Sequence, residues 1–283
     1  MPRSPGRMRT IVLAVILTAY ACGRLLEIAF GPVPTTPLVA IEVLSAMALA
    51  LVDGAYRYGV RGIAAFSLIC LVVGNLIENL GLATGFPYGR YAFLPVMGPR
   101  IFAVPVLLGL GYVGMAYASW TIGELIAGPI SARLRVVLVP LVAACVMVAW
   151  DLAQDPVWST MLGAWVWRDG GAWFGVPLSN YCGWFATVFL LCLLFAFSLH
   201  WQRPTQRVVK PSALPALLLY AFCAAGNMLQ LFVRRRTAEV LDGSGKLWRV
   251  DDILVESAVV SLFVMGAFAA IAAARLKSAE ATG

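Results

Sequence analysis

Three carboxylates lie inside segments of this sequence that are otherwise apolar. Glu78 occurs in N-L-I-E-N-L, and Asp151 and Asp155 occur in A-W-D-L-A-Q-D-P. An ionisable side chain in the hydrocarbon of a membrane costs about 2.5 kcal/mol or more, so its presence there indicates a function. Because the chain has only one histidine, these groups predict acid–base chemistry without a metal.

Asp151 and Asp155 are four residues apart and share one face of a continuous helix. Pro156 disfavours helical geometry at Asp155, so we expect this residue at the helix end. Two carboxylates in a poorly solvated site cannot both ionise cheaply, and one of them can then be an uncharged acid at neutral pH. The alternative is a structural Asp-Pro turn in which Asp151 makes an interhelical hydrogen bond.

Glu78 is accompanied by two amides. Asn75 lies three residues earlier, on the same helix face, and Asn79 follows Glu78 directly. An amide can orient the carboxyl group or hold a water molecule, whereas the alternative is a structural hydrogen bond between helices. Arg24 and Glu27 are also three residues apart, and we expect an internal ion pair there.

The composition requires that membrane helices position these groups. Hydrophobic residues make up 61% of the 283 residues and charged residues only 12%. Apolar runs of about 20 residues occur at 10–30, 37–52, 62–82, 101–123, 136–154, 178–199, 213–233 and 253–274. The second run is short and Gly226-Asn227 interrupts the seventh. We therefore predict an all-α, polytopic integral membrane bundle of seven or eight transmembrane helices, forming a single transmembrane domain over residues 1–283.

Two loops, 83–100 and 155–177, are rich in Gly, Pro and aromatic residues and are expected to be ordered caps at the membrane surface. If the eight apolar runs are eight successive membrane crossings, odd-numbered helices end, and even-numbered helices begin, on the same face of the membrane. The polar residues near these ends should then share the capped leaflet, and the opposite leaflet should be nearly free of such groups. They are Glu27, Glu42, Glu78, Asp151, Asn180, Asn227 and Glu256. By contrast, the basic segment 234–252 is expected to be an ordinary solvated connection.

Several function classes are disfavoured. The net charge of +7 comes from basic residues in short loops, which orient the chain and do not predict a nucleic-acid partner. Five of the six cysteines, Cys22, Cys70, Cys145, Cys192 and Cys223, fall in apolar runs without a C-x-x-C pair and are expected to be small buried hydrophobes. The sequence contains no cluster of histidines, and its one G-x-G-x-x-G pattern, at 109–114, lies inside an apolar run and not in a loop between a strand and a helix. Two kinds of chemistry remain possible for this chain. They are proton transfer that needs no cofactor and catalysis at a Mg²⁺ site made of carboxylates alone.

Four stretches of the sequence carry a family resemblance. They are E-N-L-G-L-A-T-G-F-P-Y-G-R-Y-A-F at 78–93, G-P-R-I-F-A-V-P at 98–105, A-W-D-L-A-Q-D-P at 149–156, and G-A-W-V-W through G-V-P-L-S-N-Y-C-G-W at 163–184. With these motifs the chain resembles the CruF-type carotenoid 1,2-hydratase family of membrane carotenoid-biosynthesis proteins, over most of residues 60–200. Where the family has Asn-Phe in the last motif, this chain has Asn180-Tyr181.

The resemblance implies a cofactor-independent hydro-lyase, with no metal, that adds water across the terminal 1,2 (1′,2′) double bond of an acyclic or monocyclic carotenoid. It implies the lipid bilayer and other carotenoid enzymes as partners, and the bacterial cytoplasmic membrane as the location. We expect Asp151 or Asp155 to donate the proton, with Glu78 as a further catalytic group. Contacts to substrate and water are expected from Asn75, Asn79, Asn180, Tyr88, Tyr91, Trp150, Trp165, Trp167 and Trp184.

Two other functions remain open. D-L-A-Q-D supplies a D-x-x-x-D motif that could bind Mg²⁺ and diphosphate in a UbiA-like membrane prenyltransferase, with Asp251-Asp252 as a poor second motif. A non-catalytic protein that binds carotenoid or lipid would instead use the polar residues as a structural network.

Overall fold

The computed structural model describes residues 5–30, 36–201, 212–234 and 237–281. Its helices are α1 (Pro5–Phe30), α2 (Thr36–Thr84), α3 (Val106–Ala127), α4 (Ala132–Asp155), α5 (Leu178–Trp201), α6 (Leu214–Arg234), α7 (Val250–Val259) and α8 (Gly266–Ala281). Its strands are β1 (Tyr91–Phe93), β2 (Arg100–Ile101), β3 (Val104–Pro105), β4 (Trp165–Trp167), β5 (Glu239–Leu241) and β6 (Leu247–Arg249). The strands form short ribbons in the loops, so the predicted helical membrane bundle is confirmed.

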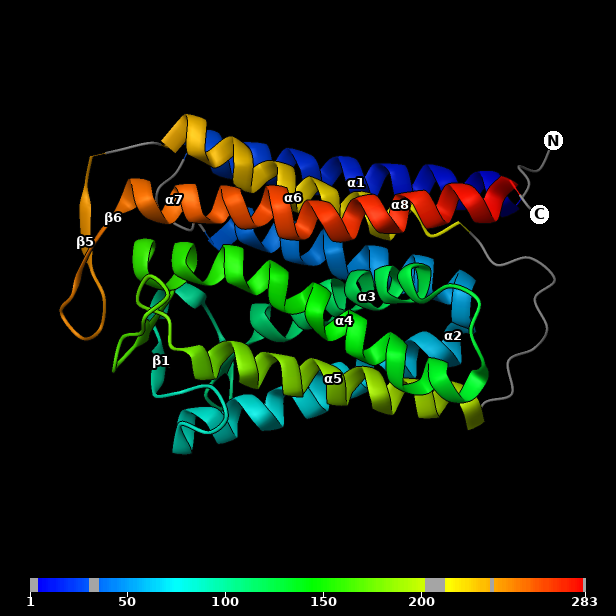
Figure 1. Cartoon of the computed structure of the whole chain (residues 1–283), viewed down its shortest axis with the longest axis horizontal. Coiled ribbons are helices and arrows are strands. Elements are labelled where there is room, and N and C mark those ends of the chain that lie inside the picture. Colours follow the sequence, from blue (N-terminus) through cyan, green and yellow to red (C-terminus); the bar gives the residue numbers. More distant parts are fainter. Residues whose placement is uncertain (1–4, 31–35, 202–211, 235–236, 282–283) are drawn as a thin grey trace.

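Within the described residues, seven helical segments are long and apolar enough to cross a membrane. The segment in α2 contains two of the runs predicted from the sequence, 37–52 and 62–82, because the backbone leaves helical geometry at Gly59. The φ angle there is 76°, which glycine adopts readily because it has no Cβ. Figure 1 shows the first half of α2 running toward the end of the bundle near the chain termini, and the second half returning.

The helix that carries the aspartates continues in an unusual form. α4 ends at Asp155, but this residue keeps helical angles (φ −59°, ψ −46°), and Pro156–Met161 form a π-helical turn. Asp155 therefore lies at the end of α4, as predicted, but it keeps the helical geometry that Pro156 was expected to disfavour. Proline fits the first position of a new helical turn, because its N–H would have no partner there. π-helical turns within helices often mark functional sites.

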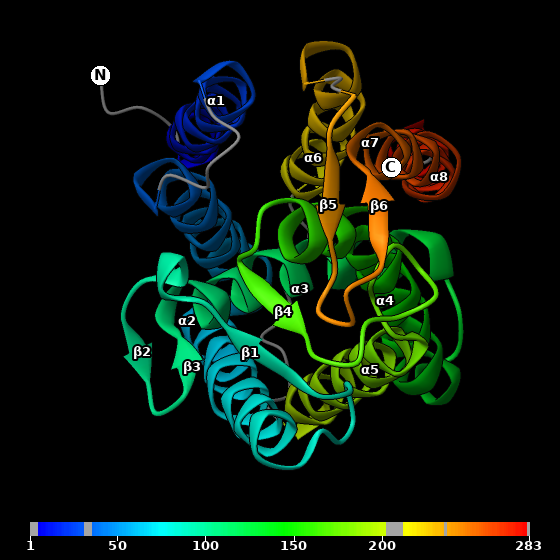
Figure 2. The ribbon, with the colours of Figure 1, turned by 90° about the vertical axis from the view of Figure 1, so that its left-hand side faces the viewer.

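The two aromatic loops meet over one end of the bundle. β1 and β4 pair antiparallel, with Tyr91 opposite Trp167 and Phe93 opposite Trp165. Figure 2 looks onto this end and shows β1 and β4 across the helices, with the β5–β6 hairpin beside them. Residues 237–252 are thus not a simple solvated connection, and Arg235 and Arg236 lie outside the described residues. Gly243 in the hairpin packs so closely that an added Cβ would lie 2.1 Å from the carbonyl oxygen of Trp167.

The half of the bundle opposite the aromatic loops also holds buried charges, contrary to the expectation from sequence. Asp53 is completely buried, where it binds Arg9 and accepts a hydrogen bond from Tyr117 Oη at 2.5 Å. Glu124 binds Arg57 at 2.9 Å and Arg135 at 2.8 Å. Each carboxylate is paired with arginine, which reduces the cost of burying the charge.

Helices α2 and α3 approach closely at Gly114. A methyl group at this position would lie 2.6 Å from Cβ of Ala46 and 2.8 Å from its carbonyl carbon. We therefore expect Gly114→Ala to lower the free energy of unfolding by about 1–3 kcal/mol, because overpacking separates the two helices. Thermal denaturation in detergent measures the change.

Gly109→Ala is the matched control on the same helix. Its added Cβ would meet only Cδ2 of Leu71, at the ordinary distance of 3.7 Å. Alanine favours the helix more than glycine does, so the midpoint of this variant should stay the same or rise. Equal midpoints for the two variants would contradict the close approach at Gly114.

Candidate active site

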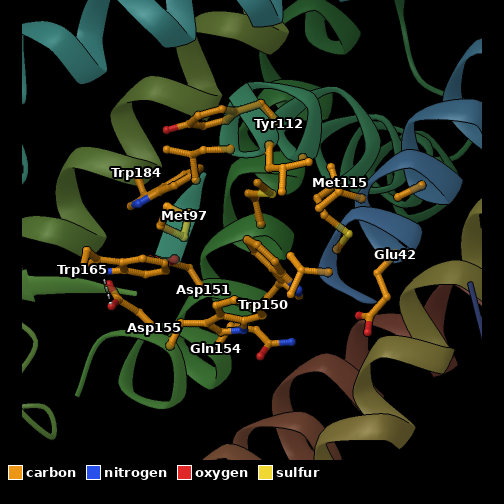
Figure 3. A pocket seen from close by; sticks show the side chains of 18 of the residues that line it. Glu42, Met97, Tyr112, Met115, Trp150, Asp151, Gln154, Asp155, Trp165 and Trp184 are labelled. Carbon is orange, nitrogen blue, oxygen red and sulfur yellow. Dashed lines mark hydrogen bonds between the residues drawn. The ribbon is translucent and has the colours of Figure 1, made fainter. Parts of the chain in front are cut away.

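A cavity of about 1160 Å³, counting the space at its mouth, lies between the helices and the aromatic loops. Its lining includes all three predicted catalytic carboxylates together with Asn180, Tyr88, Tyr91, Trp150, Trp165, Trp167 and Trp184. In Figure 3, Asp151, Asp155 and Trp165 lie at one side of the cavity and Glu42 lies at the other.

Asn180, at the start of α5, joins the two aspartates of α4. Its Nδ2 donates to Oδ2 of Asp151 at 3.0 Å and to Oδ2 of Asp155 at 2.7 Å. The spacing of four residues places both carboxyl groups on one helix face, as predicted. All three side chains are at least 96% buried, since the most exposed of them, Asp151, has a relative exposure of 4%.

The two carboxyl groups differ in their remaining partners. Oδ1 of Asp155 accepts hydrogen bonds from the indole nitrogens of Trp165 at 3.0 Å and Trp167 at 3.1 Å. These residues alternate with Val166 along β4, so their side chains leave the strand on the same face. Oδ1 of Asp151 has no hydrogen-bond partner among the described residues. Asp155 therefore accepts hydrogen bonds from three N–H donors, whereas Asp151 presents an oxygen without a partner.

Glu78 is held by two phenols. Tyr91 on β1 donates to Oε2, and Tyr112 on α3 donates to Oε1. Burial raises the pKa of Tyr91, and the Glu78 carboxylate beside it raises that pKa further. The phenol of Tyr91 therefore keeps its proton and remains a donor. Tyr88 lines the same wall, and its Oη is 2.9 Å from Oγ1 of Thr187.

The amides beside Glu78 have a different role from the expected one. Asn79 Nδ2 donates to Oδ1 of Asn75 at 2.9 Å, and its Oδ1 accepts from the backbone N–H of Ala103 at 3.3 Å. Asn75 and Asn79 do not line this cavity. They link α2 to the loop before α3. The hydrogen bonds to Glu78 that Asn75 was expected to make come instead from the phenols of Tyr91 and Tyr112.

Aromatic and thioether side chains form most of the remaining wall. Tyr112 stacks on Trp184, with ring centroids 4.7 Å apart, and Trp158 lies parallel to Trp165 at 6.5 Å. Met97, Met115 and Met147 also line the cavity. Methionine adapts to irregular apolar ligands because its side chain is flexible. The walls therefore suit a long apolar molecule, and the polar groups are concentrated near the carboxylates.

The sequence did not point to Tyr112, Gln154 or the lining roles of Arg24 and Glu42. A tyrosine inside an apolar helix is a signal in itself, because a buried phenol normally finds a hydrogen-bond partner. The predicted Arg24–Glu27 ion pair is present. Cys22 and Cys145, by contrast, are exposed on the surface of the bundle, so the expectation that they are buried was wrong.

Comparisons with known proteins identify the family of this chain. The family described as carotenoid biosynthesis protein matches residues 36–243. A bisanhydrobacterioruberin hydratase from Haloarcula japonica is 30% identical over 189 residues, which are 66% of this chain and 61% of the relative. No solved structure matches. The matched residues include the carboxylates and both aromatic loops, and they cover more than half of the sequence. The chain is thus an integral membrane protein that belongs to the carotenoid biosynthesis protein family.

Proposed function

We propose that this protein adds water across the terminal 1,2 double bond of an acyclic carotenoid end and so forms a tertiary alcohol. The observation that carries the proposal is the Asp151–Asn180–Asp155 group in the wall of an aromatic cavity. The name of the Haloarcula japonica relative, a hydratase, supports the same reaction class. The proposed location is the bacterial cytoplasmic membrane, with the apolar part of the substrate in the bilayer.

Asp151 is the proposed acid. Three N–H donors, from Trp165, Trp167 and Asn180, favour the ionised form of Asp155. A second negative charge one helical turn away would be costly in this buried place, so Asp151 retains its proton. Because Oδ1 of Asp151 has no partner in the described part of the chain, its proton can pass to a substrate.

The proposed reaction has two steps. The proton of Asp151 bonds to C2 of the alkene through the π electron pair, and a tertiary cation forms at C1. The oxygen of a water held by Glu78 and Asn180 then bonds to C1, and the surplus proton of that water passes to Glu78. Loss of this proton to solvent and return of another to Asp151 complete the cycle, with one water added in total.

The aromatic wall assists the first step. The rings of Trp165, Trp184 and Tyr112 line the cavity near the carboxylates. A cation over the face of such a ring gains about 2 kcal/mol when it is desolvated. Several rings would therefore stabilise the cation, but the proton must still come from a carboxylic acid.

Expression in a lycopene-producing host, followed by mass spectrometry of the pigments, tests the proposal. We expect a pigment heavier by one water, or by two waters if both ends react. Fragmentation should locate the new hydroxyl group at the tertiary carbon of the chain end. Unchanged lycopene, with the protein present in the membrane, would refute this activity for that substrate.

Tyr112→Phe tests the proposed role of Glu78. The variant keeps the ring stacked on Trp184 but removes the phenol that donates to the carboxylate. A hydrogen bond to a charged group contributes about 1.5–3 kcal/mol, so hydration should fall about tenfold to a hundredfold. The rate of pigment conversion per amount of folded protein measures it.

Tyr117→Phe is the matched control. It also removes a phenol from a buried carboxylate, Asp53, but in the half of the bundle away from the cavity. Its conversion rate should remain that of the wild type. Equal losses in the two variants would show that the effect is general destabilisation.

A UbiA-like prenyltransferase is less well supported. Mg²⁺ prefers oxygen ligands, yet the oxygens of Asp155 are already occupied by N–H donors. Asp251 and Asp252 lie at the start of α7 and do not line the cavity. Activity that depends on Mg²⁺ and a prenyl diphosphate would favour this alternative.

A non-catalytic carotenoid-binding protein would need the cavity but not its carboxyl chemistry. Oδ1 of Asp151 has no hydrogen-bond partner among the described residues and is not one of the fully buried orphaned atoms, so it is open to the cavity, which a purely structural network does not require. Bound pigment without hydroxylation, unaffected by changes at Asp151, would support this alternative.

A further inference from the structure

A second polar group lines the cavity away from the aspartates. Arg24 on α1, Glu42 on α2 and Gln154 on α4 all contribute to the lining. Arg24 pairs with Glu27, lies 3.9 Å from Oε2 of Glu42, and donates to Asn227 at 2.5 Å. Gln154 donates to the same oxygen of Asn227 at 3.1 Å. This group is therefore continuous through Gln154 with α4, the helix of Asp151.

Three buried atoms of this group lack a hydrogen-bond partner in the described part of the chain. They are Nε of Arg24, Oε1 of Glu42 and Oε1 of Gln154. Arg24 and Gln154 have relative exposures of 3% and 6%. Buried polar groups are almost always hydrogen-bonded, and unpaired ones that face a roomy cavity are typical of positions that hold water. Nε of Arg24 faces the backbone of Gly226 on α6, so the two acceptors, Oε1 of Glu42 and Oε1 of Gln154, are the atoms available for ordered water.

Arg24, Glu42 and Gln154 lie between the membrane surface and the carboxyl site. Arg24 lies six residues before the end of α1 at Phe30, and Glu42 lies six residues after the start of α2 at Thr36. At 1.5 Å per residue, both are about 9 Å from the helix ends. Gln154 is three residues after Asp151 on the same helix, and in Figure 3 it lies between Asp155 and Glu42.

The local backbone also makes room for Arg24. A Cβ at Gly226 of α6 would lie 2.6 Å from Nε of Arg24. The glycine therefore lets the guanidinium pass beside α6.

The cavity also has an apolar wall, formed by Val39, Val43 and Leu108. This wall offers no side-chain hydrogen bond, and it suits the apolar chain of the substrate.

We propose that Arg24, Glu42 and Gln154 form an inlet that binds water and passes it to the carboxyl site, apart from the apolar wall that takes the substrate. The inference rests on the proposed hydration. Its consequence is chemical, because the cation at C1 has two fates. If water is present, the C1–O bond forms; if it is absent, the cation returns a proton to the Asp151 carboxylate and becomes an alkene again.

In D₂O the two fates can be counted separately. Asp151 then delivers a deuteron to C2, and a cation that loses a proton from C2 or from a methyl group leaves deuterium in the recovered alkene. A cation captured by water gives the deuterated alcohol. The ratio of labelled alkene to alcohol, measured by mass spectrometry, reports how often water fails to arrive.

Glu42→Leu and Gln154→Met remove polar atoms of the inlet and keep similar side-chain volumes. We expect each to raise the ratio of labelled alkene to alcohol about tenfold, since each loses a hydrogen bond to water. Glu42→Gln retains polar atoms and should stay near the wild-type ratio. Thr121→Val is the matched control, because Thr121 has a buried unpaired hydroxyl on α3 but lies outside the cavity.

A wild-type ratio in both apolar variants overturns the inlet, whether or not the overall rate falls. Loss of labelled alkene and alcohol together also overturns it, because protonation itself has then failed. If the wild-type protein gives neither product, the proposed hydration is wrong. The test thus separates failure of the inlet from failure of the function.

Discussion

Replacement of Asp151 by asparagine is expected to abolish hydration while the protein remains folded. An amide has the size of the carboxyl group and keeps an oxygen that accepts from Asn180 Nδ2, but it has no acidic proton. Removal of a general acid typically lowers a rate by about 10²–10⁴-fold. The initial rate of lycopene conversion in isolated membranes, normalised to the amount of folded protein, measures the loss.

Deuterium exchange gives the same variant a second readout. If Asp151 forms the cation, Asp151→Asn should incorporate no deuterium into recovered alkene in D₂O. A variant that no longer hydrates but still exchanges would show that the proton comes from elsewhere, and Asp155 would then be the first candidate, since it shares Asn180 with Asp151.

Asp169→Asn is the control for charge removal near the membrane surface. The side chain of Asp169 is 52% exposed, and Arg90 beside it holds the pKa of this carboxyl below its usual range. It does not line the cavity, so its loss should leave hydration unchanged. A large loss in this variant would indicate that the aromatic loops tolerate no change of charge.

Two simple rules predicted part of the site from the sequence. Residues four apart share a helix face, and successive helices that cross the membrane meet at the same face. Asp151 and Asp155 share a face because they are four residues apart. Asn180 reaches them because α5 begins on the side of the membrane where α4 ends. Trp165 and Trp167 were expected in a loop over the same end, and the loop carries them to Asp155. Each inference used only chain direction and spacing.

Other features depend on partners that no local pattern reveals. Asn75 shares a helix face with Glu78, but Asn79 takes its oxygen, and the phenols of Tyr91 and Tyr112 reach Glu78 from separate elements. The choice between an amide and a phenol at Glu78 depends on how β1 and α3 pack.

The buried charges of the opposite half were also missed. Asp53 and Glu124 meet Arg9 and Arg57 only after the helices assemble. Apolar runs locate helices by average hydropathy, and such an average does not show which charged side chains will be paired. Buried pairs of this kind are therefore found from the structure and not from the hydropathy profile.

Glu78→Gln should separate the capture of water from the protonation of the substrate. Glutamine keeps one oxygen that can accept from Tyr91 or Tyr112, so the fold around the site should persist. It cannot accept the surplus proton of the attacking water, and we expect hydration to fall about 100-fold. Because Asp151 is intact, deuterium should still enter recovered alkene, and the ratio of labelled alkene to alcohol should rise.

Glu256→Gln is the matched control for this change. Glu256 is also a buried glutamate that accepts from an aromatic donor, Trp173 Nε1 at 3.2 Å, yet it does not line the cavity. Hydration in that variant should equal that of the wild type. If Glu78→Gln loses exchange and hydration in the same proportion, Glu78 acts in protonation, and the division of roles between Glu78 and Asp151 must be reversed or shared. If exchange persists while hydration fails, the two carboxylates act in successive steps, because only the second step requires a base for water.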